Sequence, residues 1–316
     1  MYQQKPNISY PSQLGILVGL VGAGLLFGGI LSVAIIFAKL GMAKGSDINA
    51  LLKPENVDLI RWLQIISTFF MFFIPAVVYA RIVSKKPLQY LGYNRWLKIE
   101  QVVLVILIMI ACLPLVGALA ELTEKIPLSA ALAKKFKEAE ENYQKQVELI
   151  MVMKTGVDFI WSLIIVAILP AIFEETVFRG GLQNLLTKWI KLPVLAIIIT
   201  SIVFSAVHFS FYGFFARMAL GIVLGLIYYH SGNIWLNILA HLFNNGAAVT
   251  FTYFQMQKTG KLPEKELEST MPLWMGALAL IIIIALIIAF VRVSKPLKQK
   301  IEEEAIPPME DNWMNV

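Results

Sequence analysis

Long apolar stretches recur along the chain, and they limit the possible folds more than any other feature. Each is long enough, or nearly so, to cross the roughly 30 Å hydrocarbon core of a bilayer as a helix. Backbone polar groups in lipid must be satisfied inside the protein, which favours spanning helices over irregular chain. The stretches are Leu14–Ala38, Leu59–Ala80, Val102–Ala120, Phe159–Leu186, Leu192–Phe211, Met218–Tyr229, Ile234–Phe254 and Leu273–Val291.

The composition favours the same fold class. Of the 316 residues, 58% are hydrophobic and 15% are charged, whereas soluble domains are about 45–50% apolar and about 25% charged. We therefore expect an all-α, polytopic membrane helix bundle with about eight transmembrane helices, of which the sixth is short. The first stretch is too long for the apolar region of a secretory signal, so we expect it to be a retained span.

Basic residues predict how the bundle is oriented. The loop after the second stretch contains Arg81, Lys85, Lys86, Arg95 and Lys98, and an excess of Lys and Arg marks cytoplasmic loops. We therefore expect an integral protein of the bacterial inner (cell) membrane, with both termini cytoplasmic. The net charge of +6 fits contact with anionic headgroups of the lipid bilayer, and no nucleic-acid-binding pattern is present.

The chain divides into three predicted regions. Residues 1–156 would contain the first three transmembrane helices and an amphipathic insertion near 121–155, interpreted as a solvated helical connector because its charges are mixed. Residues 157–256 would form the core with helices four to seven. Residues 257–316 would contain an outer loop, the last helix and a disordered cytoplasmic tail from Ile301. A single cysteine, Cys112, excludes an internal disulfide and a cysteine-ligated metal cluster.

Polar residues within the apolar stretches are candidates for function. A charged side chain near the centre of a bilayer costs about 2.5–3.5 kcal/mol on insertion scales, so those that occur there are usually functional. Two of the three histidines of the chain lie in such stretches. The residues are Glu174, Glu175 and Arg179 in the fourth stretch, His208 in the fifth, and His241 and Asn245 in the seventh.

Spacing along the fourth helix separates the roles of its two carboxylates. Glu175 and Arg179 are four residues apart, so they can neutralise each other, and we interpret them as structural or supporting residues. Glu174 is rotated by about 100° from Glu175 on an ideal helix and faces other partners. An isolated buried carboxylate is a candidate general base. Pro170 and the Gly180-Gly181 pair interrupt the helix nearby, which would let water reach this depth.

Two further pairs have the same spacing of four. Phe204 lies one turn before His208, and His241 lies one turn before Asn245. A single intramembrane histidine is more often a helix-to-helix hydrogen bond than a catalyst. Two histidines with an isolated Glu and an Asn make a set large enough to activate a water and hold an oxyanion. The third histidine, His230, is interpreted as a loop residue of a predicted turn.

On these residues the sequence resembles the CPBP family, the CaaX protease and bacteriocin-processing family of intramembrane proteases, also called Abi and including CaaX prenyl protease 2. Its EExxxR motif appears as Glu174 to Arg179, its FxxxH motif as Phe204 to His208, and its HxxxN motif as His241 to Asn245. The three motifs occur in the family's order, and the resemblance covers roughly 159–254.

The resemblance implies an endopeptidase that hydrolyses a peptide bond near the membrane, in a peptide or protein substrate that is prenylated in part of the family. Glu174 would be the general base, aided by His208, and His241 and Asn245 would stabilise the oxyanion. In the competing version the enzyme is a metalloprotease, with His208, His241 and Glu174 binding a divalent metal such as zinc. The sequence leaves both versions open.

Two functions of other classes also remain open. The chain would be a non-catalytic immunity or scaffold protein if the motifs served only as a folding core, although the intact motifs argue against a dead site. A proton-coupled transporter would use the buried Glu and His residues as a relay. Against a transporter, the first half of the chain does not repeat the broken-helix pattern of inverted-repeat transporters.

Overall fold

The computed structural model describes residues 8–51, 53–260 and 271–305, and within these ranges the chain is helical with no strand. Every apolar stretch of the sequence lies mainly on a helix or a continuous run of helices. The predicted fold class, an all-α polytopic helix bundle, is confirmed.

The first half of the chain forms three long apolar helical runs, 10–42, 57–83 and 99–124, and an amphipathic helix at Ala130–Ile150. The segment around Phe69–Phe73 is π-helical and joins α3 to α4 without a break. The helices are α1 (Tyr10–Gly45), α2 (Ile48–Leu51), a 3₁₀ turn (Pro54–Asn56), α3 (Val57–Thr68), α4 (Ile74–Val83), α5 (Pro87–Tyr90), α6 (Ile99–Glu124) and α7 (Ala130–Ile150).

The second half contains the residues of the three motifs. One continuous helical run, Gly156–Ile190, includes two π-helical segments, Leu163–Ile168 and Thr176–Gln183. The helices are α8 (Gly156–Ser162), α9 (Leu169–Glu175), α10 (Asn184–Ile190), α11 (Pro193–Ala206), α12 (Phe214–Ser231), α13 (Ile234–Thr259) and α14 (Leu273–Ala305).

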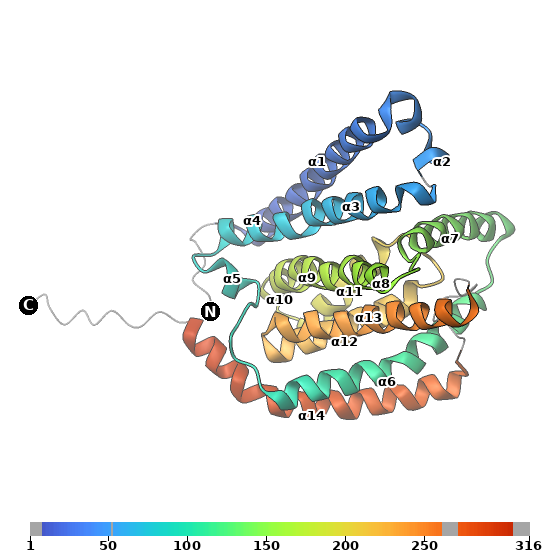
Figure 1. Cartoon of the computed structure of the whole chain (residues 1–316). Helices are drawn as coiled ribbons and strands as arrows, with labels where there is room; N and C mark the ends of the chain where they lie inside the picture. Colours follow the sequence, from blue (N-terminus) through green and yellow to red (C-terminus); the bar gives the residue numbers. More distant parts are fainter. Residues whose placement is uncertain (1–7, 52, 261–270, 306–316) are drawn as a thin grey trace, which may run out of the picture.

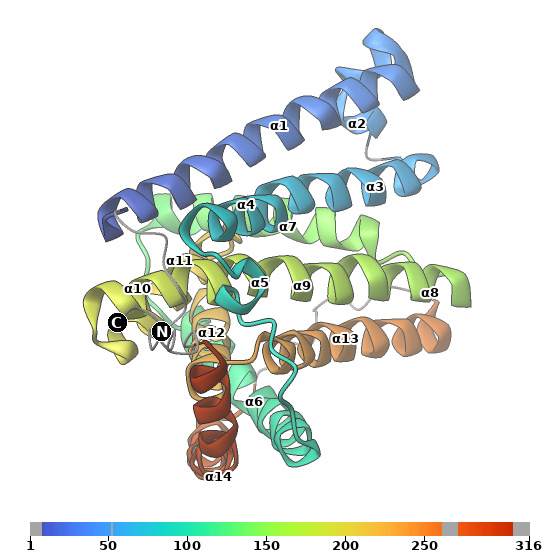
Figure 2. The same cartoon turned by 90° about the vertical axis from the view of Figure 1, so that its left-hand side faces the viewer.

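The helices are arranged so that the core of the motifs lies in the middle of the bundle. In Figure 1, α1 and the α3–α4 run form the upper side, α6 and α14 form the lower side, and α9, α11 and α13 lie between them. Figure 2 shows the same order from the perpendicular direction. Helix α6 packs along α14, and α11 packs along α12. The motif residues are therefore enclosed by other helices.

Six helical runs of the described chain are long and apolar enough to cross a membrane: 10–42, 57–83, 99–124, 156–190, 214–231 and 273–304. Helix α11, with 14 residues, is apolar but shorter, and α13, with 26 residues, is not among the six. The protein is therefore an integral membrane protein. The count of eight transmembrane helices stays a prediction.

Some boundaries differ from those expected. Helix α11 ends at Ala206, so His208 lies in a turn instead of within a helix. This turn is closed by the Ser205 hydroxyl, which donates to the Phe214 carbonyl at 2.7 Å. His230 lies in the last turn of α12 instead of in a loop.

The polar end of the chain also differs from the prediction. Helix α14 continues to Ala305, so the first residues of the predicted disordered tail are helical. Two contacts explain this: Lys298 donates to the Tyr229 carbonyl at 2.7 Å, and Arg95 pairs with Glu304 at 2.7 Å. Residues 306–316, and most of the predicted outer loop after α13, lie outside the described residues.

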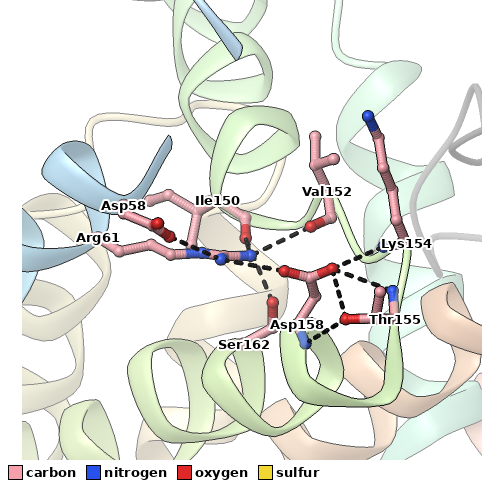
Figure 3. Close-up of polar contacts among 8 residues, drawn as sticks. All are labelled: Asp58, Arg61, Ile150, Val152, Lys154, Thr155, Asp158 and Ser162. Atoms are coloured by element: carbon pink, nitrogen blue, oxygen red, sulfur yellow. Dashed lines mark hydrogen bonds and ion pairs between the residues drawn. The ribbon is translucent and has the colours of Figure 1, made fainter. Parts of the chain in front are cut away.

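A buried arginine joins α3 to the segment between α7 and α8 (Figure 3). Arg61 is 5% exposed. Its Nη1 lies 3.4 Å from Oδ1 of Asp58 and 3.4 Å from Oδ1 of Asp158. Its Nη2 donates to the carbonyl oxygens of Val152 at 3.1 Å and Ile150 at 3.5 Å. One side chain therefore fixes the end of α7 and the start of α8 to a distant helix.

Replacement of this arginine tests its role. Arg61→Ala removes the donor of the Val152 carbonyl and one of the donors of the Ile150 carbonyl and of Asp158, and we expect a loss of about 2 kcal/mol of stability. Thermal unfolding of the purified protein in detergent measures this change. Asp58→Ala is the control, because Asp58 is 89% exposed and exposed ion pairs contribute little. Equal unfolding temperatures for Arg61→Ala and the wild type would contradict the assignment.

Candidate functional site

The two adjacent carboxylates lie where a regular helix becomes π-helical. Glu174 and Glu175 are the last residues of α9, and the π-helical segment Thr176–Gln183 follows at once and carries Arg179. π-helical turns within helices are frequent at functional sites. Glu174 is 9% exposed, and Glu175 and Arg179 are 0% exposed. Three charged groups are thus buried within two turns of one helix.

The Glu175 carboxylate accepts contacts from three side chains. Its Oε1 lies 2.9 Å from His241 Nδ1. Its Oε2 lies 3.2 Å from Arg179 Nε and accepts a hydrogen bond from Asn237 Nδ2 at 3.3 Å. Both oxygens are therefore satisfied, which a buried carboxylate requires. This single group connects the α9 region to α13.

Glu174 differs from its neighbour because one of its oxygens has no partner. Its Oε2 is buried and has no hydrogen-bond partner among the described residues. His241 Nε2 lies 4.0 Å from this oxygen. This separation is too long for a direct hydrogen bond, but a water molecule can bridge two polar atoms at such a distance. Glu174 and His241 therefore face a position suited to a water.

His208 reaches the same region from the turn after α11. Its Nδ1 lies 2.8 Å from the Phe204 carbonyl oxygen. When Nδ1 donates to that carbonyl, Nε2 of the neutral ring is left as the acceptor. The His208 ring packs against the Phe204 ring, and the His241 ring packs against the same phenylalanine. The ring is thus oriented by its own helix end, with one nitrogen available for proton transfer.

Phe204 lies between the other groups of the site. Its ring contacts His208 edge-to-face with centroids 5.2 Å apart, and His241 with centroids 6.0 Å apart. The Arg179 guanidinium lies over the same ring, 4.8 Å from its centroid. This cation–π contact partly compensates the buried positive charge. The phenylalanine of the FxxxH spacing thus packs against residues of both other motifs.

Asn245 is held by the backbone of the π-helical segment that lies just before Pro170. Pro170 has no N–H, so the carbonyl of Val166, four residues earlier, lacks its usual helical donor. The Asn245 amide donates to that carbonyl at 3.0 Å, and its oxygen accepts from Asn244 at 3.1 Å. A carboxamide has two N–H donors. One of them is therefore engaged by the Val166 carbonyl beside Pro170.

Sequence reasoning missed two residues of this region. Asn237 donates to Glu175 and to the Leu224 carbonyl, at 3.3 and 2.7 Å. It lies four residues before His241, so extending the His241–Asn245 spacing by one turn would have found it. Arg217 donates to the Ser210 carbonyl at 2.9 Å, beside the His208 turn. It is a charged residue at the edge of an apolar stretch, which was the available signal.

The same histidines and carboxylates are the candidate ligands of a metal. No group of three or more His, Cys, Asp or Glu side chains is placed to hold a metal ion in the part of the chain that is described. The Nδ1 atoms of His241 and His208 contact the Glu175 carboxylate and a backbone carbonyl, which are the contacts that metal-binding histidines usually make through their second nitrogen. Nε2 of each ring therefore keeps the capacity to bind a metal, and the version with His208, His241 and Glu174 as zinc ligands stays a prediction.

Comparison with known protein families gives a match to the second half of the chain. Residues 156–247 match the family described as type II CAAX prenyl endopeptidase Rce1-like. This segment contains all three motifs and both π-helical segments of the continuous run. No curated protein and no solved structure matches the chain.

The ion pair between Arg179 and Glu175 can be tested by stability. Arg179→Ala removes one partner of a fully buried pair and leaves a carboxylate in a dry environment, which typically costs about 3–5 kcal/mol. We expect a large fall in the unfolding temperature and in the yield of folded protein. Lys134→Ala, at a side chain that is 79% exposed, is the control and should leave both unchanged. Wild-type stability of Arg179→Ala would show that the pair is not structural.

Proposed function

We propose, on the premise that the chain belongs through residues 156–247 to the CPBP family of CaaX-type intramembrane proteases, that it hydrolyses peptide bonds. The attacking water is activated by Glu174 and His208. The observation that carries this mechanism is the buried Glu174 oxygen without a partner, 4.0 Å from a histidine nitrogen. A buried polar atom without a partner calls for a water or a ligand. A carboxylate in that position is suited to take a proton from a water.

His208 acts together with Glu174 in the proposed first step. The water oxygen attacks the scissile carbonyl carbon while Glu174 accepts one of the water protons. His208 orients the water through Nε2. The proton is then passed to the leaving amine. The support for this role is the contact of Nδ1 with the Phe204 carbonyl, which leaves Nε2 free to face the water.

His241 and Asn245 stabilise the oxyanion in this proposal. The Glu175 carboxylate accepts from His241 Nδ1, and it fixes the ring so that Nε2 points toward Glu174, as a carboxylate does in other catalytic His pairs. The flanking carboxylates stabilise a positive charge on the ring, which then donates to the oxyanion. The second N–H of Asn245 is a further donor. A single donor of this kind typically contributes about 10²–10³ in turnover.

The substrate class follows from the family and is proposed at two levels. At the coarser level it is a peptide or protein segment presented at the membrane. At the finer level it is a prenylated C-terminal peptide; the family description itself reads CAAX prenyl endopeptidase. A membrane site enclosed by helices suits a substrate that carries its own lipid anchor.

Cleavage of a peptide panel tests the proposal. The purified full-length protein in liposomes is incubated with matched prenylated and unprenylated peptides. We expect Glu174→Gln to lower kcat by about 10²–10⁴ with an unchanged unfolding temperature. Glu100→Gln, at an exposed residue at the start of α6, is the control and should keep wild-type turnover.

The other arms of the experiment decide the chemistry. Activity that survives a chelator supports the glutamate mechanism. Activity that a chelator removes and zinc restores contradicts it and favours a metalloprotease. Wild-type turnover by Glu174→Gln would sink the assignment of the general base. No cleavage of any peptide by the wild-type protein would instead favour a binding or immunity role.

A further inference from the structure

Helix α7 lies against the turn that carries His208. The rings of Phe136 and Phe211 stack in parallel with centroids 4.3 Å apart. The Ser210 hydroxyl donates to Oε2 of Glu140 at 2.7 Å. Further along, the Arg217 guanidinium lies 5.7 Å from the centroid of the Tyr143 ring. Two of these contacts are made by residues two and three positions after His208.

The contacts all come from one face of α7. Phe136, Glu140 and Tyr143 are spaced by four and three residues, so they align along the helix. Together with Ala133 and Val147 they are the half-buried residues between 133 and 147, and the other residues described in that interval are exposed. The helix therefore has one docked stripe and a charged outer surface. A solvated connector would not require such a stripe.

The far end of α7 is anchored independently. Val147 packs with a buried cluster that includes Met151, Met153 and Val249 of α13. Arg61 of α3 binds the carbonyl at Ile150, the last residue of α7 (Figure 3). Because this end is fixed to two other helices, the position of the half-buried face of α7 against the His208 turn is fixed as well.

The turn is closed by its own hydrogen bonds, such as that from Ser205 to Phe214, but it contains a strained residue. Phe209, next to His208, has a φ of +53° and is 82% exposed. A positive φ in a bulky residue is strained, and such a conformation persists only when the surroundings enforce it. Within the turn, Ser210 supplies an acceptor to Gly213 N and to Arg217. Ser210 is thus the residue through which the turn is held both internally and by Glu140.

From these contacts we propose that α7 positions His208, with Glu140 as the positioning residue that acts through Ser210. This inference rests on the proposed function, because His208 is the group that must be held. Glu140 does not reach the reacting atoms. Its effect is to keep the strained turn in the one conformation that directs the His208 ring toward Glu174. The insertion near 121–155 thereby becomes part of the active structure.

The test compares three substitutions on α7. Glu140→Ala removes the acceptor of the Ser210 hydroxyl. Glu140→Gln keeps an acceptor oxygen at the same place and should restore the contact. Glu141→Ala removes the same charge from the neighbouring exposed residue and is the matched control. All three are made in the full-length protein in liposomes.

Hydrogen exchange of the backbone amides over residues 207–214 is the first readout, and it does not depend on activity. We expect Glu140→Ala to accelerate exchange there by about fivefold, the effect of losing one hydrogen bond. Glu140→Gln and Glu141→Ala should exchange like the wild type. Equal exchange in all four proteins would overturn the proposal.

Turnover is the second readout. We expect Glu140→Ala to lower kcat by about tenfold or more with little change in KM, because a misplaced catalytic group affects the chemical step. Glu140→Gln should restore it. Faster exchange with unchanged kcat would also overturn the proposal. If the wild type cleaves no peptide, the proposed function fails, and the exchange data alone then decide whether Glu140 holds the turn.

Discussion

The rest of the site depends on the satisfied carboxylate of Glu175. A fully buried carboxylate is stable only if its charge is compensated and its lone pairs are occupied. Arg179 supplies the charge, and His241 and Asn237 supply donors from α13. The same contacts fix the distance between two helices and the rotation of the His241 ring. Because Arg179, Asn237 and Nδ1 of His241 all contact Glu175, one oxygen of the neighbouring Glu174 is left without a hydrogen-bond partner among the described residues.

Irregular helix geometry brings the other groups into place. The run Gly156–Ile190 contains two π-helical segments and a proline, and each leaves backbone groups that need other partners. In a membrane such groups must be satisfied by protein. Asn245 answers this need at Val166. Asn245, a residue of the third motif, therefore also supplies a hydrogen-bond donor to the helix that carries the first motif.

The sequence was sufficient for the fold class and for the set of polar residues. Apolar length predicts helices directly, and spacing of four predicts that Glu175 and Arg179 share a face. The sequence was insufficient where tertiary contacts determine the residue at which a helix ends. The end of α11 depends on Ser205 reaching Phe214, and the helical end of α14 depends on Arg95 reaching Glu304. Asn237 belongs to none of the three motifs, and only the four-residue spacing extended one turn before His241 indicates it.

The adjacency of Glu174 and Glu175 has a consequence for how such a chain tolerates insertions. The two side chains have opposite environments, one fully paired and one with a free oxygen, although they differ by a single helical step of about 100°. Adding one residue between Pro170 and Glu174 would turn Glu174 to the direction that Glu175 now faces and would turn Glu175 a further step away from its partners. Removing one residue would turn Glu175 to the direction of Glu174 and leave Glu174 facing elsewhere. The helical phase of this run is therefore a more stringent requirement than its length.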